Sequence, residues 1–507
     1  MRVLFATAEA YPLAKTGGLA DVSRALPLAL RRLGVDVRLL MPAYPGAYLR
    51  LEDPKIVAKI PAAMGVSDGT LVAGTFPDAD LPAYLIDSPS LFQRDGGLYQ
   101  DKDGKDWPDN PLRFAFLAHV GRELAMGRIP IGFRPDVVHA NDWHAGLLPL
   151  FLSLEEEPRP ATIFTTHNMA FQGNFPAEWL EQLGIPAALF SPGGVEFYGQ
   201  ISFLKAGLRY ADRVTTVSPT YAREILTAEF GCGMDGVVLE RGDDFSGILN
   251  GIDEVLWNPA NDPALPRPYR ESDISGKRAC KAALQQEFGL TVAPDTPVLG
   301  FISRITHQKM ADVILEMMPC LAKQDVQFVA VGEGDPKMEA AFEQACELYS
   351  GKIAVVVGYD EPLAHKLQAG ADILLAPARF EPCGLTQLYG LRYGSLPVVR
   401  RTGGLADTVV DATATSIADR SATGFVFDDP TADDLTAALN RALGLYREPL
   451  IWRRLQLQAM AQDFSWNSSA RQYATLYSAA SGLPVDLGIQ GTAAAFAAQQ
   501  TARQAAQ

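Results

Sequence analysis

The sequence has few of the features on which metalloproteins, disulfide-stabilised proteins and membrane proteins depend. Its five cysteines are scattered without a CxxC pair, and its six histidines form no HExxH motif. We therefore expect neither a metal site nor a disulfide framework. No apolar run reaches the roughly 18 to 20 residues of a membrane-spanning helix. The first residues contain one arginine and then resemble a short strand, so we expect no signal peptide. These absences favour a protein of the reducing cytoplasm.

The chain also lacks an excess of basic residues. Lys and Arg number 44 against 59 Asp and Glu, which gives a net charge of −15 and a pI near 5.0. Proteins that bind nucleic acid by broad electrostatic attraction need the opposite balance. We expect no nucleic-acid partner and no membrane partner. An anionic ligand must instead meet a few basic residues that are placed locally.

The pattern of apolar segments predicts an α/β protein with two doubly wound domains. A length of 507 residues exceeds what one hydrophobic core usually serves. Short apolar strands alternate with helical segments, which is typical of parallel sheets covered on both faces. The first set of strands is expected at 3–6, 35–40, 135–139, 161–166 and 213–217, with a helix at about 19–33. The second set is expected at 297–303, 326–331, 353–357 and 372–376.

Proline content predicts the position of the domain boundary. Residues 258–268 contain four prolines, which neither an interior strand nor a continuing helix accommodates. We expect a first domain at 1–255 and a second domain at 256–460. A C-terminal helix at 461–478 is expected to pack back on the first domain. The Ala/Gln-rich residues 479–507 have few large apolar groups and are expected to form a mobile tail.

The sequence TGGLAD occurs twice, at residues 16–21 and 402–407, each time after a basic residue. The first copy follows the first predicted strand and opens a helix. Two glycines let the backbone approach a ligand, and helix N-terminal amides attract anions. Lys15, Gly17 and Gly18 are therefore candidate phosphate contacts, although a tight turn with an exposed lysine explains the same residues. The second copy follows a later strand, and we expect a helix-opening turn that at most supports the site.

Four further strand ends carry polar or charged residues: SRITHQK at 303–309, RFEPCGLTQ at 379–387, TTHN at 165–168 and HANDWH at 139–144. Each has a plain structural explanation, such as solvated cations, a helix-start carboxylate, a buried histidine or a core tryptophan. Together they put cations and carboxylates at strand ends, where doubly wound sheets bind ligands. There is no Ser/His/Asp motif, no Walker A lysine and no metal-ligand cluster. This combination indicates a phosphorylated sugar as the ligand.

These segments closely resemble the bacterial glycogen synthases, which are relatives of the plant starch synthases in glycosyltransferase family 5. The resemblance runs from Met1 to about residue 478 and includes KTGGLADV, HANDWHAGLLP, THNMAFQG, ILNGID, SRITHQK, GYD and RFEPCGLTQLYG. It implies the GT-B fold, in which two Rossmann-like domains face each other across a deep cleft. It also implies transfer of glucose from ADP-glucose to the 4-hydroxyl at the non-reducing end of an α-1,4-glucan. It further implies that the anomeric configuration is retained and that neither a metal nor a cofactor takes part. It also implies that residues 1–255 lie on the glucan-acceptor side and residues 256–460 on the nucleotide-sugar side.

Carried over residue by residue, the resemblance implies four catalytic residues. Arg304 and Lys309 resemble the cations that neutralise the departing ADP. Glu381 resembles the carboxylate that holds glucose hydroxyls, and His167 the residue placed near the reacting carbon. The implied nucleotide-sugar contacts are Lys15, Gly17, Gly18, Asn250, Tyr359, Cys383, Gly384, Leu385 and Thr386, with Tyr359 stacking on the adenine. The implied acceptor or sugar contacts are Tyr99, Asp142 and Trp143.

One position departs from the family pattern. Met310 follows Lys309 where the family generally has glycine, so we expect an altered turn that affects the pose of Lys309. Because the implied site residues come from both domains, we also expect a hinge near residues 250–265 that closes on the nucleotide sugar.

Two other kinds of function fit parts of the same pattern. One is a related enzyme of this fold, such as a UDP-glucose-dependent transferase or a glucan phosphorylase, the latter requiring a pyridoxal-phosphate lysine. The other is a non-catalytic glucan-binding protein. Such a protein is expected to have lost some of Lys15, Arg304, Lys309 and Glu381, yet all four are present.

Overall fold

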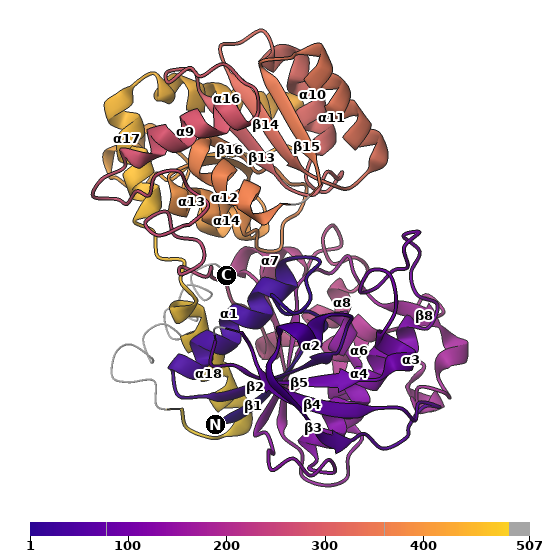
Figure 1. The fold of residues 1–507 in the computed structure, drawn as a ribbon. Helices are drawn as coiled ribbons and strands as arrows, with labels where there is room; N and C mark the ends of the chain where they lie inside the picture. Colours follow the sequence, from indigo (N-terminus) through magenta and orange to yellow (C-terminus); the bar gives the residue numbers. More distant parts are fainter. Residues whose placement is uncertain (78, 359, 486–507) are drawn as a thin grey trace. The chain divides into compact units, whose positions relative to one another are not determined.

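The chain folds into two units, each built on its own large sheet. The structure, a computed structural model, describes residues 1–485 apart from 78 and 359 (Figure 1). The first unit comprises residues 1–217, 222–251 and the described residues from 466 onward. The second comprises residues 218–221 and 252–465. The chain therefore passes between the units at 217/218, 221/222, 251/252 and 465/466.

The first unit contains a large, mostly parallel sheet. Its strands are β1 (Arg2–Ala6), β2 (Asp36–Pro42), β3 (Glu52–Lys59), β4 (Thr70–Thr75), β5 (Pro82–Asp87), β6 (Val137–Asn141), β7 (Ala161–Thr166), β11 (Arg213–Thr216) and β12 (Phe245–Gly247). They lie in the order β12-β11-β7-β6-β1-β2-β5-β4-β3. Pairing is parallel from β12 to β5 and antiparallel from β5 to β3. A small antiparallel sheet contains β8 (Asn174–Pro176), β9 (Glu196–Phe197) and β10 (Gln200–Ser202).

Helices of the first unit follow the strands. They are α1 (Gly18–Arg32), α2 (Ala47–Arg50), α3 (Pro89–Phe92), α4 (Asn110–Ala125), α5 (Leu147–Ser153), α6 (Phe203–Tyr210), α8 (Asp235–Leu239) and α18 (Trp466–Ser481). Helix α7 (Pro219–Glu224) is divided, with residues 219–221 in the second unit and 222–224 in the first. Short 3-10 turns lie at Trp143–Ala145, Ala187–Leu189, Ala177–Trp179 and Gly242–Asp244. In α1, Leu19, Val22, Leu26 and Leu30 are buried. This spacing of three and four residues puts one apolar face of α1 toward the core.

The second unit contains a wholly parallel sheet. Its strands are β13 (Val298–Ile302), β14 (Gln327–Gly332), β15 (Ile353–Val357), β16 (Ile373–Leu375), β17 (Leu396–Arg400) and β18 (Phe425–Phe427), in the order β15-β14-β13-β16-β17-β18. Its helices are α9 (Gly276–Glu287), α10 (Ala311–Leu321), α11 (Pro336–Leu348), α12 (Glu361–Gly370), α13 (Thr386–Tyr393), α14 (Gly403–Thr408), α15 (Ala414–Ala418), α16 (Ala432–Tyr446) and α17 (Pro449–Met460). The expected α/β architecture with two doubly wound parallel sheets is confirmed.

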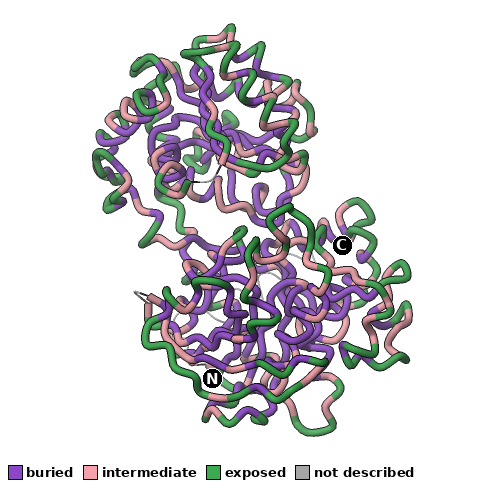
Figure 2. The backbone as a smooth tube through the Cα atoms, turned by 45° about the vertical axis from the view of Figure 1, so that its right-hand side comes forward, coloured by how far each residue is buried: buried purple, intermediate pink, exposed green. Residues whose placement is uncertain are grey.

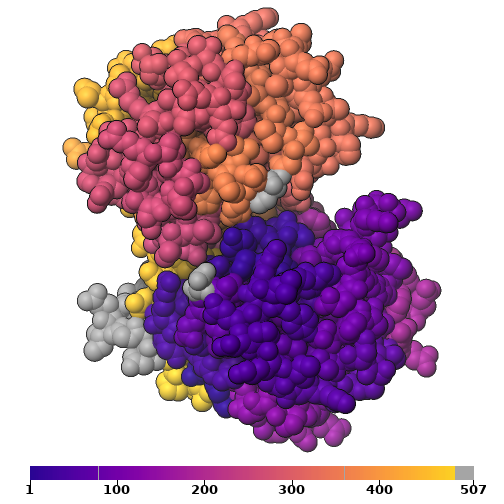
Figure 3. Space-filling view, viewed as in Figure 1, coloured from indigo at the N-terminus to yellow at the C-terminus, as the bar shows by residue number. Residues whose placement is uncertain are grey.

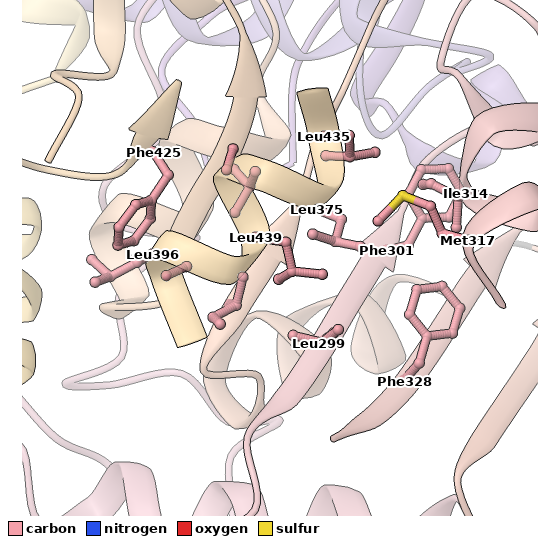
Figure 4. Close-up of a cluster of buried hydrophobic side chains, with 14 of the residues drawn as sticks. Leu299, Phe301, Ile314, Met317, Phe328, Leu375, Leu396, Phe425, Leu435 and Leu439 are labelled. Atoms are coloured by element: carbon pink, nitrogen blue, oxygen red, sulfur yellow. The ribbon is translucent and has the colours of Figure 1, made fainter. Parts of the chain in front are cut away.

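Hydrophobic clusters cover both faces of this second sheet. Side chains of β13 alternate between them: Leu299 and Phe301 join the cluster that includes Met317 of α10 and Leu439 of α16 (Figure 4). Val298 joins the opposite cluster, which includes α9 and α12 side chains. Alternation of this kind is what a strand buried on both faces produces. In each unit the buried backbone follows the sheet, and exposed residues lie mainly in loops and outer helix turns (Figure 2).

The proline-rich residues 258–268, where we expected the domain boundary, pack within the second unit. Asp262 is buried there and accepts a 2.5 Å hydrogen bond from the Tyr393 hydroxyl. His365 Nδ1 lies 2.7 Å from the same carboxylate oxygen. Proline excludes regular secondary structure but not burial. The change of unit therefore falls earlier, between Gly251 and Ile252.

The last described helix, α18, belongs to the first unit. It packs against α1, and the surfaces of these two helices lie next to each other in Figure 3. The Tyr477 hydroxyl lies 2.7 Å from Nδ1 of buried His139 in β6. This helix begins at Trp466, a few residues after the expected start at 461. The expected mobile tail lies outside the described residues from 486 onward.

Candidate active site

The candidate residues of the first unit gather at the carboxyl ends of its parallel strands. Asn141, the last residue of β6, is paired in register with Thr165 of β7. Asp142 and His167 directly follow these two strands, and the turn of Lys15 lies between β1 and α1. This edge is where doubly wound sheets bind their ligands.

A carboxylate that the sequence did not single out closes the turn before α1. Glu9 is 3% exposed and accepts hydrogen bonds from the Thr16 backbone N–H (2.6 Å), the Thr16 hydroxyl (2.5 Å) and the Gly17 N–H (3.3 Å). The Tyr99 hydroxyl also donates to this carboxylate. We expected the Gly17 amide to face a phosphate, but in the structure it donates to Glu9.

In the same turn Thr16, Gly17 and Gly18 are exposed, and Lys15 is partly exposed. Lys15 Nζ donates a 3.0 Å hydrogen bond to Asp21 and lies 5.2 Å from the centre of the Tyr11 ring. The Lys15 and Asp21 side chains are 23% and 24% exposed. Gly18, the first residue of α1, is exposed. An anionic ligand can therefore reach both the ammonium group and the start of the helix.

Asp142 combines backbone strain with an unpaired buried oxygen. Its φ of 59° and ψ of 177° lie in a region that is nearly confined to glycine and that costs roughly 1–3 kcal/mol. The residue is buried, and its Oδ1 has no hydrogen-bond partner within the described chain. Burial raises the pKa of Asp142 to about 7, against backbone hydrogen bonds from Trp143 and His167 that lower it. Such features typically mark a site at which a ligand completes the missing contacts.

Three aromatic rings stack beside Asp142. The Trp143 and His144 rings lie 3.9 Å apart at 27°, and the His144 and Tyr99 rings lie 4.5 Å apart at 30°. Burial holds the pKa of His144 well below its usual range, so the middle ring is neutral. Gly173 backs the stack, because a Cβ there would lie 2.3 Å from the Trp143 ring. Trp143 and Tyr99 are partly exposed, and aromatic rings beside a carboxylate are suited to the apolar face and hydroxyls of a sugar.

His167 and Asn250 add polar groups after β7 and β12, which lie on either side of β11 in the sheet. His167 Nε2 lies 3.2 Å from Asn141 Oδ1, and burial lowers the pKa of His167 to about 4. Its imidazole is therefore neutral near pH 7. Asn250 is 5% exposed, and its Oδ1 has no partner among the residues that the structure describes. This oxygen is available to a ligand donor.

In the second unit, Lys309 and Glu381 form an ion pair. Lys309 follows β13 and Glu381 follows β16, and these strands are parallel neighbours. Lys309 Nζ donates to Glu381, and the two side chains are 20% and 11% exposed. Arg304 lies exposed on the same loop as Lys309, and its guanidinium is 3.3 Å from Gln308 Oε1. Gln308 donates in turn to the Phe380 carbonyl at 3.2 Å, which ties the two loops together.

The turn after Glu381 is fixed by Gln387 and by the second TGGLAD copy. Gly384 has φ +73°, and the Gln387 amide donates to the carbonyls of Cys383 (3.0 Å) and Gly384 (2.9 Å). The Gly404 N–H donates to the Glu381 carbonyl at 3.1 Å. A Cβ on Gly404 would lie 2.1 Å from the Cys383 carbonyl oxygen. The second copy therefore packs directly against the turn that carries Glu381.

Leu385 and Thr386 complete this turn and start α13. Leu385 is the residue before the helix, and no described side chain caps its first turn. Backbone N–H groups at the start of a helix attract anions. On the other side of the turn, the Ser218 hydroxyl donates to the Pro382 carbonyl at 2.6 Å.

Met310 occupies a glycine-like conformation. Its φ is 53° and its ψ is 32°, in the left-handed region that costs a non-glycine residue roughly 1 kcal/mol or more. The side chain is fully buried in the cluster beneath α10. The turn after Lys309 therefore keeps a backbone conformation suited to glycine although methionine stands there.

One expected contact cannot be placed. Tyr359 lies outside the described residues. Over the described chain, no group of three or more His, Cys, Asp or Glu side chains is placed to hold a metal ion. In the same part of the chain, no helix has the length and apolarity needed to cross a bilayer.

Three residues at these strand ends were missed by sequence reasoning. Glu9 lies in a short loop without a motif, and its donor Tyr99 is 90 residues away. Gln387 was quoted within a motif but had no assigned role, and His144 was passed over beside Trp143. Of the three, only Gln387 could have been proposed from the sequence, because it follows the same predicted strand as Glu381.

Comparison with known proteins gives consistent matches to both units. Residues 2–240 match the family model described as the starch synthase catalytic domain, and residues 296–444 match glycosyl transferases group 1. The catalytic domain of starch synthase IV from Arabidopsis thaliana, bound to ADP and acarbose, is similar with a TM-score of 0.86 and 32% identity. The match covers 95% of this chain and 99% of that one. A sucrose-phosphate synthase from Thermosynechococcus elongatus shares the fold, with a TM-score of 0.58, 18% identity, and coverage of 94% and 98%.

Curated relatives match over nearly the whole chain. The glycogen synthase of Burkholderia thailandensis is 52% identical over 479 residues, which cover 94% of this chain and 90% of that protein. Glycogen synthase 1 of Methylococcus capsulatus is 49% identical, with coverage of 94% and 96%. The chain belongs to the glycogen synthase family of GT-B glycosyltransferases.

Proposed function

We propose that the chain transfers glucose from ADP-glucose to the 4-hydroxyl at the non-reducing end of an α-1,4-glucan, with retention of configuration. Curated glycogen synthases about half identical over nearly the full length support this activity. The observation that carries it is the Lys309–Glu381 pair at the ends of β13 and β16. A cation beside a carboxylate is suited to a ligand that joins a phosphate to a hydroxylated sugar.

Arg304 and Lys309 have the charge that departure of ADP requires. Breaking the bond between glucose and phosphate leaves negative charge on the phosphate, so fixed cations stabilise the transition state more than the ground state. Lys15 and the amides at the starts of α1 and α13 are proposed as further diphosphate contacts. In this proposal Glu381 exchanges part of its pairing with Lys309 for glucose hydroxyls.

The first unit supplies neutral groups around the sugar in this proposal. His167 has a lowered pKa of about 4, so near pH 7 its imidazole offers hydrogen bonds to glucose without adding charge. Asp142 and the ring of Trp143 are proposed to contact the sugar or the acceptor. The unpaired oxygens of Asp142 and Asn250 would each gain a hydroxyl donor.

Retention is proposed to follow a front-side route. The bond from the anomeric carbon to the ADP oxygen breaks, the bond to the acceptor oxygen forms on the same face, and the phosphate takes the acceptor proton. The residue assigned near the reacting carbon is His167, which is not a carboxylate nucleophile. Isolation of a glucosyl adduct on a carboxylate would contradict this route.

The decisive experiment is incorporation of labelled glucose into glycogen from ADP-glucose and from UDP-glucose, measured side by side. We expect incorporation from ADP-glucose to be much faster. Comparable rates from both donors would refute the proposed donor preference, and incorporation from neither would refute the transferase itself. Cytoplasmic location is part of the proposal and is supported by all five cysteines being free thiols.

Lys309→Ala is expected to lower turnover roughly 100- to 1000-fold, the usual effect of removing one donor that stabilises transition-state charge. Glucan binding should change little, because Lys309 is assigned to the phosphate. Turnover and glycogen affinity are measured on the same preparation. Lys366→Ala, which removes a partly exposed lysine paired with Glu287 in α9, is the control. Equal losses of turnover and glycogen affinity in Lys309→Ala would disprove the assigned role.

A further inference from the structure

Glu9 collects hydrogen bonds from two distant segments of the first unit. Its carboxylate accepts from the backbone and hydroxyl of Thr16, from the Gly17 amide and from the Tyr99 hydroxyl. Thr16 and Gly17 precede α1, whereas Tyr99 lies in the segment that leads to α4. At 3% exposure, the carboxylate is shielded from water, and its removal would break all of these hydrogen bonds at once.

The position of this carboxylate is the one that an anion would otherwise take. The first N–H groups of a helix, starting with that of the residue just before it, have no partner within the helix, and the helix dipole adds partial positive charge there. Gly17 is this residue in α1, and Thr16 precedes it. Phosphates commonly bind to such amides. Here the Thr16 and Gly17 amides are already bonded to Glu9, while Lys15 and Gly18 of the same turn remain accessible.

We propose that Glu9 is a positioning residue that fills the anion position at the start of α1. It orders the turn at 15–18 and holds Tyr99 against His144. It also directs the donor diphosphate away from the Thr16 and Gly17 amides and toward Lys15 and Gly18. The part concerning the donor rests on the proposed function, whereas the occupied anion position does not.

The surroundings of Glu9 agree with a role beyond closing a turn. The Tyr99 ring that it holds is stacked on His144, which is stacked on Trp143. One carboxylate thus links the predicted phosphate turn with the predicted sugar surface. The charge of Glu9 also contributes to the raised pKa of Asp142, after the larger effect of burial.

A first test measures binding of inorganic phosphate by calorimetry, which does not depend on activity. Glu9→Ala frees two backbone amides and removes a negative charge, so phosphate affinity should rise about tenfold over the wild type, the order expected for new charge-assisted hydrogen bonds. Glu9→Gln keeps the shape without the charge and should show a smaller rise. Unchanged phosphate affinity in both folded variants would overturn the proposal.

Asp212→Asn is the matched control. Asp212 also accepts from a backbone amide, that of Thr162 at 2.8 Å, and pairs with Arg159 in the same unit. Asp212→Asn should therefore destabilise the first unit without changing the turn before α1. Phosphate affinity in this variant should equal that of the wild type, and a rise equal to that of Glu9→Ala would overturn the proposal.

A second test uses chemical rescue. Formate is small enough to replace the missing carboxylate of Glu9→Ala, so it should raise the turnover of this variant severalfold, and phosphate should reverse the gain. Asp212→Asn should show no rescue. Absence of rescue in folded Glu9→Ala that has lost turnover would overturn the positioning role. If the wild type transfers no glucose, the proposed function fails, while phosphate calorimetry still decides whether Glu9 fills the anion position.

Discussion

At the scale of single residues, burial of Asp142 makes the free energy of unfolding depend on pH. Burial raises its pKa from 3.8 to about 7, so the folded chain holds the proton more tightly than the unfolded chain. Stability from this group is complete below about pH 4. It is lost as the pH rises toward 7, because over this range the carboxyl ionises in the unfolded chain while the folded chain still holds the proton.

Asp142→Asn should remove this dependence, since asparagine has nearly the same shape and no charge. We expect the variant to gain stability relative to the wild type between pH 5 and pH 8, and the gain to be larger at pH 8. Urea unfolding at both values measures it. Asp80→Asn, at a side chain that is 86% exposed, controls for the substitution itself. A difference between Asp142→Asn and the wild type that is the same at both pH values would show the assignment to be wrong.

Met310 affects stability in two opposite ways, through the strain of its backbone and through the burial of its side chain. Glycine would remove backbone strain of roughly 1 kcal/mol, but it would also delete a fully buried side chain, which costs about 2–5 kcal/mol. Met310→Gly should therefore lower the free energy of unfolding by about 1–4 kcal/mol, as the difference of these two effects. Turnover per folded molecule should change little, because the backbone after Lys309 already has a glycine-like conformation.

Met310→Ala separates the two effects. Alanine loses most of the same packing but keeps the strain at φ 53°. Urea unfolding should therefore rank stability in the order wild type, Met310→Gly, Met310→Ala. If Met310→Ala proved as stable as Met310→Gly, backbone strain would not contribute at this position.

At the scale of elements, the two TGGLAD copies differ in what surrounds them. Gly18 of the first copy is exposed, whereas its equivalent in the second copy, Gly404, is buried, and a Cβ added there would lie 2.1 Å from the Cys383 carbonyl oxygen. That oxygen belongs to the backbone of the turn after Glu381, so a side chain at Gly404 would have to displace backbone atoms. The sequence identity of the copies predicts two strand-to-helix turns, which the structure has. Their different packing follows from neighbours that are remote in sequence.

Gly404→Ala is expected to displace the turn at 381–384. The methyl group must push back the Cys383 carbonyl and break the Gly404 hydrogen bond to Glu381, so stability should fall by about 1–3 kcal/mol. The KM for ADP-glucose should rise more than the affinity for glycogen falls. Gly444→Ala in α16, where a Cβ meets nothing within 4 Å, is the matched control and should not reduce stability. An unchanged KM for ADP-glucose in Gly404→Ala would show that α14 does not support the binding of the donor.

Sequence patterns predicted most of the buried parallel strands because each is a short apolar run, but they missed β5 and β18, which are also buried and paired in parallel. Predicted strands at 161–166 and 353–357 coincide with β7 and β15. The antiparallel edge was missed because β3 is largely exposed and has no apolar face. Lys309 and Glu381 were predicted as site residues because each follows a predicted strand, and the carboxyl ends of adjacent parallel strands lie at the same edge of the sheet. Glu9 was not predictable in this way, because its role depends on Tyr99, whose approach no local pattern encodes.

At the scale of the whole molecule, the segment that joins the two units does not lie where the proline content of the sequence predicted it. Four prolines made residues 258–268 the expected boundary, yet this segment is anchored in the second unit through Asp262. The backbone passes between units at 251/252 and again at 465/466. These passages are adjacent, because the Ile252 N–H donates to the Phe464 carbonyl at 2.8 Å and Ile252 bridges to Ser465. Two adjacent passages are where we now expect a hinge, in place of the wider range 250–265.

Closure about this hinge is expected when ADP-glucose binds. The proposed donor contacts come from both units, Lys15 from the first and Arg304 and Lys309 from the second, so full contact requires both to approach one ligand. Small-angle X-ray scattering should show a smaller radius of gyration with ADP-glucose than without it. Lys309→Ala should need more ligand for the same change, while Lys366→Ala should follow the wild type. Identical scattering profiles with and without saturating ADP-glucose would mean that the donor is bound without closure, and the contacts assigned to one of the two units would have to be withdrawn.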